Sequence, residues 1–526
     1  MSQRNDRRLL VIGLDACDRE LLEAWTAQGH LENLAKLRAE GAWTSLKTTA
    51  EILHVSAWPS IYSGVPADRH GLYHAYVMLP GQQAPARPRP DLCPVPFVWK
   101  LLDERGKRCI VMDAFLTCPL QGFGGIQIVD WGSWTHFWKP TILPESVQRE
   151  MRRFGPYPAE DHSSVGMTPP VDPVGFRGRL LKAVEAKTRV VEWLAQTQPW
   201  DFFLAVFGEG HAAGHYFWHY QDSSYTAYPQ TVDPLLRTAL LDVYRALDRA
   251  IGTLLAYADD RTTVLVVSGD GMGPNHSGSH LLEELLRRMG LLNAPSEAGS
   301  AGARPQKRGR NLLGTIRGLV PRDLRAAVSR HLLPRSVNER LSLHWKTAGI
   351  DWARTRAFLI ENANEGFVRV NLRGREPFGI VGAGAEYDDL CANVLAVAAA
   401  MTNPATGRVA ASAVHKTADV FDGPCSSLLP DVIINWDPNA LTTTDLDAGA
   451  HGVLRGRAPF EVSPFYTGNH RPNAFLAGIG PAVSKNSIPG DASILSLAPT
   501  ILAHFGIDAG AGMDAPVLEP FAGRAA

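Results

Sequence analysis

Two histidines four residues apart are the side chains whose types and spacing most directly suggest chemistry. His211 and His215 would share one face of a helix, because residues i and i+4 lie one above the other. Imidazole is the commonest metal-binding side chain in proteins. The pair therefore predicts a metal site, while a packed helix surface that includes the aromatic residues 216–218 is the alternative interpretation.

Two carboxylates follow apolar runs of the kind that form buried strands. Asp15 comes directly after the run 9–14, and Asp270 lies shortly after the run 264–267. Strands buried on both faces read as continuous apolar runs, so each aspartate is expected at the tip of a strand. For Asp270 a tight turn is the alternative, since Gly-Asp-Gly is a common turn sequence.

The surrounding sequence alternates predicted strands with predicted helices. The strands are expected at 9–14, 109–112, 201–207 and 262–267, and the helices at 20–39, 97–105 and 244–257. This alternation predicts an α/β fold with a mostly parallel sheet flanked by helices on both faces. Because ligands bind beyond the carboxyl ends of such strands, we expect Asp15, residues 209–215 and Asp270 to line one crevice.

Several segments, in order along the chain, resemble one known family. They are residues 56–64, 68–73, 268–272 and 468–472, with further matches at 350–358, 370–376, 429–431 and 497–502. These segments are similar to the type I phosphodiesterase/nucleotide pyrophosphatase branch of the alkaline phosphatase superfamily. The resemblance implies a single alkaline phosphatase-like domain over residues 1–526.

The resemblance also implies a site with two divalent metals, commonly zinc, and a Thr or Ser nucleophile that forms a covalent phospho-enzyme. Two metals suit this chemistry because they activate the nucleophile and neutralise charge on the phosphoryl group and the leaving oxygen. By position, Asp15 and residues 268–272 would serve one metal. His211, His215 and His470 would serve the other.

Three positions depart from the family pattern. The Asp-x-x-Gly-His motif begins here with His211, and the Ser-Asp-His-Gly-Met motif reads Ser-Gly-Asp-Gly-Met around Asp270. The nucleophile position, counted back from Gly64, holds His54, and the nearest hydroxyl is that of Ser56. Each replacement is still a metal-binding residue type. The sequence therefore predicts an altered, His-enriched metal site. The alternatives are an inactive site and an error in the register by which these positions are matched to the family motifs.

The predicted site residues form two overlapping sets. The metal ligands are Asp15, His54, His211, His215, Asp270 and His470, and the catalytic candidates are His54 and Ser56. His54 is expected as a ligand in place of the lost hydroxyl, with phosphorylation of His54 or attack by Ser56 as alternatives. Glu209 is a further candidate for a ligand or general base, and a capping or surface carboxylate is its alternative.

Two stretches interrupt the strand and helix pattern. Residues 131–175 are rich in Trp, Pro and His and predict a loop-rich insertion. Residues 290–346 predict a basic helical cap insertion, because the part 304–340 holds ten Lys and Arg against two acidic residues, with apolar residues at helical spacing. The cap is either a solvated layer on the sheet domain or an arm for an anionic substrate or membrane surface.

The overall composition excludes several classes of protein. The chain has 526 residues, 52 Lys and Arg against 53 Asp and Glu, and a formal charge of −1. Such a balance argues against bulk binding of nucleic acid, and the chain contains no apolar run long enough for stable membrane insertion. The six scattered cysteines favour reduced thiols and a cytoplasmic location. The expected partner is a small anionic, phosphorylated substrate, and the oligomeric state stays open.

The leading hypothesis is a metal-dependent hydrolase of phosphate esters, most simply a phosphodiesterase or pyrophosphatase with two zinc ions. The second hypothesis keeps the fold but places iron or manganese in the altered site for a different, non-hydrolytic reaction. A non-catalytic protein with structural metals is the third. The metal content of protein purified without chelator distinguishes the three.

Overall fold

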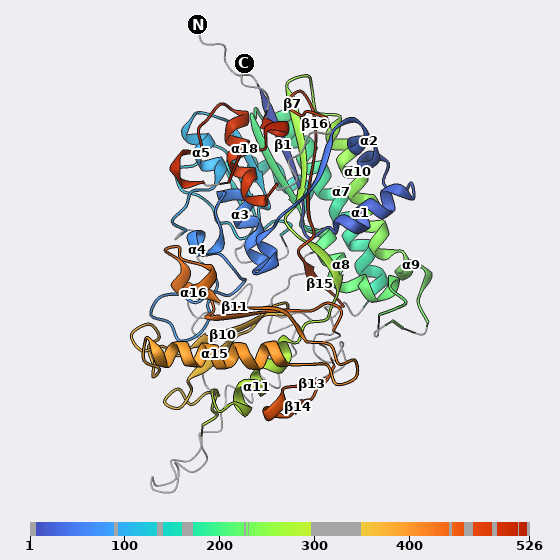
Figure 1. Ribbon diagram of the computed structural model, residues 1–526. Helices are drawn as coiled ribbons and strands as arrows, with labels where there is room; N and C mark the ends of the chain where they lie inside the picture. The colour runs from blue at the N-terminus through green and yellow to red at the C-terminus, as the bar shows by residue number, and fades with distance from the viewer. Residues whose placement is uncertain are drawn as a thin grey trace, which may run out of the picture.

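The computed structural model is organised around one large sheet and a smaller second sheet (Figure 1). The structure describes residues 7–88, 93–133, 140–159, 172–225, 228–229, 231–295, 349–440, 444–456, 467–485, 492–513 and 515–522. Within these residues, no helix combines the length and the apolar character needed to cross a membrane.

The large sheet has eight strands, most of them parallel. In spatial order they are β2 (Ala42–Leu46), β16 (Ala474–Ile479), β7 (Thr262–Ser268), β1 (Arg8–Leu14), β6 (Phe202–Phe207), β3 (Cys109–Met112), β4 (Ile126–Val129) and β5 (Thr141–Leu143). The five strands from β7 to β4 run parallel, whereas β16 and β5 pair antiparallel to their neighbours. The predicted α/β fold with a mostly parallel sheet is therefore confirmed.

Helices cover both faces of the large sheet (Figure 1). One face carries α1 (Arg19–Ala27), α2 (Glu32–Glu40), α7 (Pro173–Thr197), α8 (Glu209–Gln221) and α10 (Ala239–Leu255). The other face carries α3 (Ala57–Ser63), α5 (Val98–Glu104) and α18 (Leu497–His504). The helix expected at 20–39 is two helices, because Gly29 after α1 has the left-handed φ of 79° that ends a helix.

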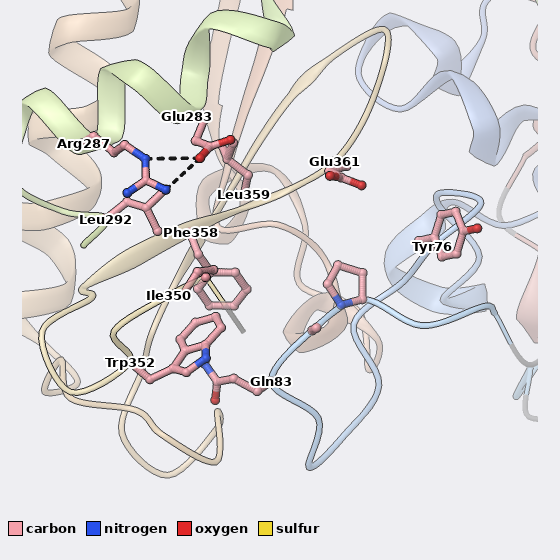
Figure 2. A pocket seen from close by; sticks show the side chains of 13 residues that line it. Tyr76, Gln83, Glu283, Arg287, Leu292, Ile350, Trp352, Phe358, Leu359 and Glu361 are labelled. Atoms are coloured by element: carbon pink, nitrogen blue, oxygen red, sulfur yellow. Dashed lines mark hydrogen bonds and ion pairs between the residues drawn. The ribbon is translucent and has the colours of Figure 1, made fainter. Parts of the chain in front are cut away.

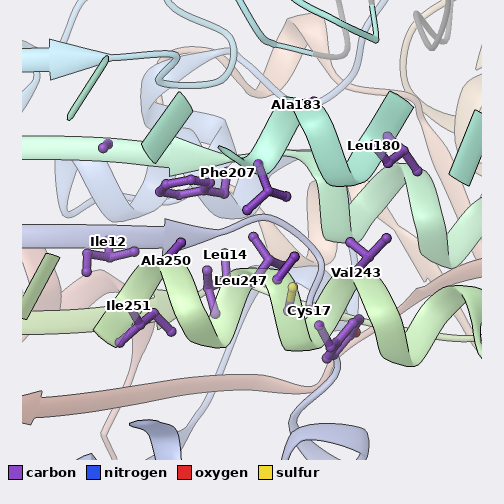
Figure 3. Packing of buried hydrophobic residues seen from close by; sticks show 14 of the residues in the cluster. Ile12, Leu14, Cys17, Leu180, Ala183, Phe207, Val243, Leu247, Ala250 and Ile251 are labelled. Carbon is purple, nitrogen blue, oxygen red and sulfur yellow. The ribbon is translucent and has the colours of Figure 1, made fainter. Parts of the chain in front are cut away.

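Buried apolar side chains hold these layers together. Successive side chains of a strand point to opposite faces, and accordingly Ile12 packs in the core under α10 whereas Val11 packs in the core of the other face. Figure 3 shows Ile12 and Leu14 of β1 beside Leu247 and Ile251 of α10. Fully burying an apolar side chain of this size contributes about 1.5–3 kcal/mol, so the position of β1 and of its carboxyl end is firmly fixed.

The second sheet lies beyond the carboxyl ends of the parallel strands (Figure 1). Its strands, in order, are β11 (Ala411–Lys416), β12 (Val432–Trp436), β10 (Gly366–Val370) and β9 (Ala357–Ile360), and every neighbouring pair is antiparallel. Together with α11 (Leu282–Arg288) and α15 (Ala385–Ala400), it encloses a third apolar core. The strand patterns found in the sequence do not predict this sheet.

The two predicted insertions differ in how much of them the structure describes. In the range 131–175 the described residues include β5, the short helix α6 (Glu145–Met151) and the first turn of α7. Of the basic cap predicted at 290–346, residues 296–346 lie outside the described residues.

A short antiparallel ribbon joins the region between the two sheets to α8. It consists of β15 (Gly468–Arg471) paired with β8 (Gly271–Pro274). A Cβ atom on Gly468 would lie 2.2 Å from the carbonyl oxygen of Gly214 in α8. A Cβ on Gly214 would in turn lie 2.7 Å from Cγ of Met272. Glycine at these two positions therefore allows the backbone of α8 to approach the ribbon closely.

We predict that Gly468→Ala lowers the free energy of unfolding by about 1–3 kcal/mol, because α8 and β15 must separate to admit the methyl group. Chemical denaturation of both proteins measures the difference. Gly178→Ala in α7 is the matched control, since a Cβ there meets nothing within 4 Å and alanine favours a helix by up to about 1 kcal/mol. Equal stability of Gly468→Ala and wild type would contradict the close approach.

Candidate metal centre

Three histidines from two distant segments meet at the carboxyl end of the large sheet. His211 and His215 lie on α8, and His470 lies on β15. One ligand nitrogen of each lies within 4.8 Å of the other two. Nε2 of His211 is 2.8 Å from Nε2 of His215. We call these three residues the histidine cluster.

The local fold explains why these side chains converge. Helix α8 begins directly after the parallel strand β6, and the i, i+4 spacing places His211 and His215 on one face, as the sequence predicted. The ribbon register sets His470 opposite Met272 of β8, and β8 follows β7. Each histidine is therefore positioned by a parallel strand, either directly or through the ribbon.

Hydrogen bonds fix the ring orientation of the two histidines on α8. Nδ1 of His215 lies 2.8 Å from the carbonyl oxygen of Gly468, and Nδ1 of His211 lies 2.7 Å from Oδ2 of Asp15. A carbonyl or a carboxylate oxygen can only accept, so in both rings Nδ1 carries the proton. In the neutral form Nε2 then holds a lone pair, and the two Nε2 atoms face each other at 2.8 Å.

The ring of His470 is also held by a hydrogen bond from its Nδ1, here to the carboxylate of Asp270. Its Nδ1 donates to Oδ2 of Asp270 at 2.6 Å. The other oxygen of Asp270, Oδ1, is buried and has no hydrogen-bond partner among the described residues. Burial, together with the nearby carboxylates of Asp15 and Glu365, raises the pKa of Asp270 well above its usual value. A buried oxygen among several carboxylates is stabilised by a proton or by positive charge nearby, such as a metal on the neighbouring histidines.

The electrostatic surroundings keep His215 and His470 uncharged. Burial, and then the neighbouring imidazoles, lower the pKa of His215 and of His470 well below the usual value. Neutral imidazole is the form that binds metals. Facing lone pairs repel unless a proton or a cation lies between them, and an all-imidazole set suits zinc, copper, iron or nickel. The residues present therefore fit a divalent transition metal.

The aspartates predicted as metal ligands are hydrogen-bonded to two of the histidines. Asp15 accepts hydrogen bonds on both oxygens, from His211 and, at 2.6 Å, from Nε1 of Trp58. Asp270 contacts His470 in the way described above. Carboxylates that accept the Nδ1 proton of a metal-binding histidine are a recurrent arrangement, in which they orient the ring and raise its basicity. The structure thus brings both aspartates to the site, but as hydrogen-bond partners of the rings.

His54 lies beside the cluster on the 3₁₀ turn His54–Ser56, just before α3. Its ring stacks on that of His470 with the centroids 4.3 Å apart. It is not a member of the group whose ligand atoms lie within 4.8 Å of one another. Ser56, the other catalytic candidate, is fully buried, and its hydroxyl lies 2.6 Å from the carbonyl oxygen of Leu53. The structure therefore brings His54 to the site, whereas the Ser56 hydroxyl donates to the backbone carbonyl of Leu53.

Glu365 is a site residue that the sequence did not reveal. It lies between β9 and β10 of the second sheet, and both carboxylate oxygens lie within 2.9 Å of Nδ1 of His54. The backbone N–H of His54 and the side chain of Asn362 donate to the same carboxylate. Burial would raise the pKa of Glu365, but the attraction of His54 and these hydrogen bonds lower it to about 2. No periodic pattern or spacing connects Glu365 to His54, which lies 311 residues away.

Glu209, the further candidate for a ligand or general base, belongs to a buried ion-pair network. One of its oxygens lies 3.7 Å from Nζ of Lys187 and accepts a hydrogen bond from the hydroxyl of Tyr157 at 2.7 Å. Lys187 also pairs with Asp113 at 3.1 Å. Glu209 therefore anchors the first turn of α8 in the core and stands outside the histidine cluster.

A separate cavity lies in the second-sheet region, with a volume of about 210 Å³ (Figure 2). Trp352, Phe358 and Ile350 provide apolar walls, and Glu283 and Arg287 form an ion pair at its edge. None of the cluster histidines lines it. The cavity is thus distinct from the candidate metal centre.

The fold and the histidine cluster define the class of an α/β protein with a candidate transition-metal centre at the carboxyl edge of its sheet. The chain belongs to the type I phosphodiesterase/nucleotide pyrophosphatase family, whose model matches residues 9–342. The family indicates a metal-dependent hydrolase that acts on phosphate esters. No curated protein sequence is significantly similar to the chain.

Two solved structures are similar to this chain over nearly their whole length. Phosphonoacetate hydrolase from Sinorhizobium meliloti 1021 is 12% identical with a TM-score of 0.48, and the similarity covers 94% of each chain. Human ectonucleotide pyrophosphatase/phosphodiesterase 5 is 11% identical with a TM-score of 0.47 over 95% of each chain.

We predict that Asp270→Asn weakens zinc binding by about 10- to 100-fold, because the variant loses the charge that orients and polarises His470. The stability of the metal-free protein should change little, since the amide oxygen of asparagine can still accept from Nδ1 of His470 and Oδ1 of Asp270 has no partner to lose among the described residues. Competition with a chromophoric chelator and chemical denaturation provide the two measurements.

The matched control is Asp248→Asn, which alters a buried carboxylate that accepts from the backbone of Asn33 and Leu34 at the start of α2. This variant should lose stability and keep its zinc affinity. Loss of stability in Asp270→Asn without loss of zinc affinity would show that Asp270 serves only the fold.

Proposed function

We propose that the protein is a phosphodiesterase or pyrophosphatase that uses one divalent metal, most simply zinc, held by His211, His215 and His470. The observation that carries the proposal is the convergence of three imidazoles within 4.8 Å at the carboxyl edge of the sheet. A bound divalent metal would supply Lewis-acid stabilisation of a phosphoryl oxygen and would lower the pKa of water. The expected substrate is a small phosphorylated anion.

A single ion is proposed in place of the two expected from the family. Both oxygens of Asp15 are already engaged by Trp58 and His211, and one oxygen of Asp270 is engaged by His470. Within the part of the chain that the structure describes, the histidine cluster is the one group of three or more potential ligands with this spacing. These contacts support Asp15 and Asp270 as partners of the rings and not as ligands of a second ion.

The chain's own residues would prepare the site in three ways. Carboxylates hold the rings of His211 and His470, and the carbonyl of Gly468 holds that of His215, in the tautomer with the proton on Nδ1. Glu365 does the same for His54. The side chains of the cluster are largely buried, which strengthens electrostatic interactions with a phosphoryl group. The proposal also includes positive charge from the basic cap at 290–346. It further includes a reducing, cytoplasmic location, which suits six cysteines that form no disulfide in the structure.

A second candidate function follows from the chemistry of the donors. An all-imidazole set without a carboxylate ligand also suits iron or another redox metal. The same site would then support a different, non-hydrolytic reaction. Metal identity and hydrolytic activity together separate the two candidates.

We predict that removing the metal with a chelator abolishes hydrolysis of bis(4-nitrophenyl) phosphate, and that one equivalent of zinc per chain restores it. His211→Ala should lose both metal and activity, because it removes one of three donors. His219→Ala is the matched control, since it changes a histidine on the same helix that bonds to Thr467 and should keep the metal. Elemental analysis and the rate of nitrophenolate release are the measurements.

Three outcomes would count against parts of this proposal. Restoration that needs two equivalents of zinc would contradict the single ion. Bound iron in a protein that hydrolyses no phosphate ester would favour the second function. Full activity of the metal-free protein would contradict metal dependence altogether.

A further inference from the structure

His54 has the best-anchored imidazole of the site, yet it lies outside the ligand group. Glu365 receives the Nδ1 proton of His54 between its two oxygens, at 2.9 and 2.8 Å, and also the backbone N–H of His54 at 2.9 Å. Asn362 donates to the same carboxylate at 2.6 Å. Because a carboxylate only accepts, Nδ1 of His54 is the protonated nitrogen, and Nε2 is the nitrogen with a lone pair in the neutral ring.

The position of the His54 ring argues against its use as a fourth ligand. A ligand nitrogen must approach the other donors, and among the described residues the group within 4.8 Å of one another consists of His211, His215 and His470. The His54 ring instead stacks at 30° on the ring of His470. Its side chain is 9% exposed, against 2% for His211 and 6% for His470. His54 is thus beside the metal centre, with a side chain slightly more exposed than those of His211 and His470.

This arrangement suits a nucleophile. An imidazole whose N–H is donated to a buried carboxylate has a fixed tautomer and orientation, and the carboxylate stabilises the positive charge that the ring acquires when its other nitrogen forms a bond. The side chain of Glu365 is 2% exposed, so water weakens this interaction little. As a metal ligand, His54 would be oriented by Glu365 in the same way. Its ring would, however, have to leave its stacked position on His470 to reach the ion.

We propose that Nε2 of His54 is the nucleophile of the reaction and that Glu365 is the positioning residue that holds it. The proposal rests on the phosphoesterase function proposed above. Glu365 lies between β9 and β10, so the second sheet would help to position the nucleophile.

The reaction consists of two displacements at phosphorus. In the first, the lone pair of His54 Nε2 forms an N–P bond, the P–O bond to the leaving group breaks, and the leaving oxygen takes the electron pair and then a proton from water. The ring is now positively charged and keeps its Nδ1–H bond to Glu365. In the second, water attacks phosphorus, the N–P bond breaks, the electron pair returns to Nε2, and the water proton passes to solvent.

The decisive experiment is the stereochemical course with a chiral phosphorothioate diester in ¹⁸O-labelled water, using the metal-loaded full chain. Two displacements predict retention of configuration at phosphorus. Inversion would show direct attack by water and would overturn the proposal while leaving the phosphoesterase function intact. Absence of any phosphodiester hydrolysis would overturn both.

Variants give a second and independent measurement. His54→Gly should keep the metal of the wild type, lose the acid-labile, base-stable phosphoryl group that is trapped from ³²P-labelled substrate, and regain hydrolysis when imidazole is added. If His54→Gly loses the metal, His54 is a ligand and the proposal is wrong. Metal content and fold are checked on the same sample, so a misfolded variant is recognised, and the stereochemical result then decides.

Glu365→Gln tests the positioning role. We expect kcat to fall by about 10²- to 10⁴-fold with KM changed by less than about threefold, because an amide can present the wrong tautomer to His54. Glu365→Asp should recover part of kcat. Asn362→Ala, which removes one neighbouring donor to the same carboxylate, is the control and should lose much less. An equal effect of Glu365→Gln and Asn362→Ala on kcat would contradict the role given to Glu365.

Discussion

The hydrogen bonds that hold the Nδ1 proton of each imidazole are the interactions on which the rest of the site depends. His211, His470 and His54 each donate to a carboxylate, and His215 donates to a backbone carbonyl. These acceptors decide which ring nitrogen remains available, and an available nitrogen is what both metal binding and nucleophilic attack require. Without them the four rings would be a buried polar cluster with no defined chemistry.

The fold supplies these acceptors from three places that are far apart in the sequence. Asp15 follows β1 and Asp270 follows β7, so the parallel sheet brings both to one edge. The ribbon of β8 and β15 carries His470 and the carbonyl of Gly468 to α8, and the glycines at their contact allow the close approach. Glu365 arrives from the second sheet. The site is therefore complete only where the two sheets meet.

The sequence predicted the parts of the site that follow from regular structure. Apolar runs placed Asp15 and Asp270 at strand ends, and the i, i+4 spacing placed His211 beside His215. The resemblance to the family suggested His470, which no periodicity connects to α8. Glu365 was beyond prediction, because its contact with His54 depends on how two sheets pack. Whether an aspartate binds an ion directly or through a histidine is likewise a matter of about an ångström, which spacing in a sequence does not encode.

The central claim is that imidazole nitrogens, with carboxylates behind them, bind one transition metal. X-ray absorption spectroscopy of the zinc-loaded protein tests it most directly. We expect nitrogen neighbours at about 2.0–2.1 Å, strong outer-shell scattering from imidazole rings and no metal–metal distance. A metal–metal vector at about 3.5–4 Å together with carboxylate oxygen in the inner shell would contradict it.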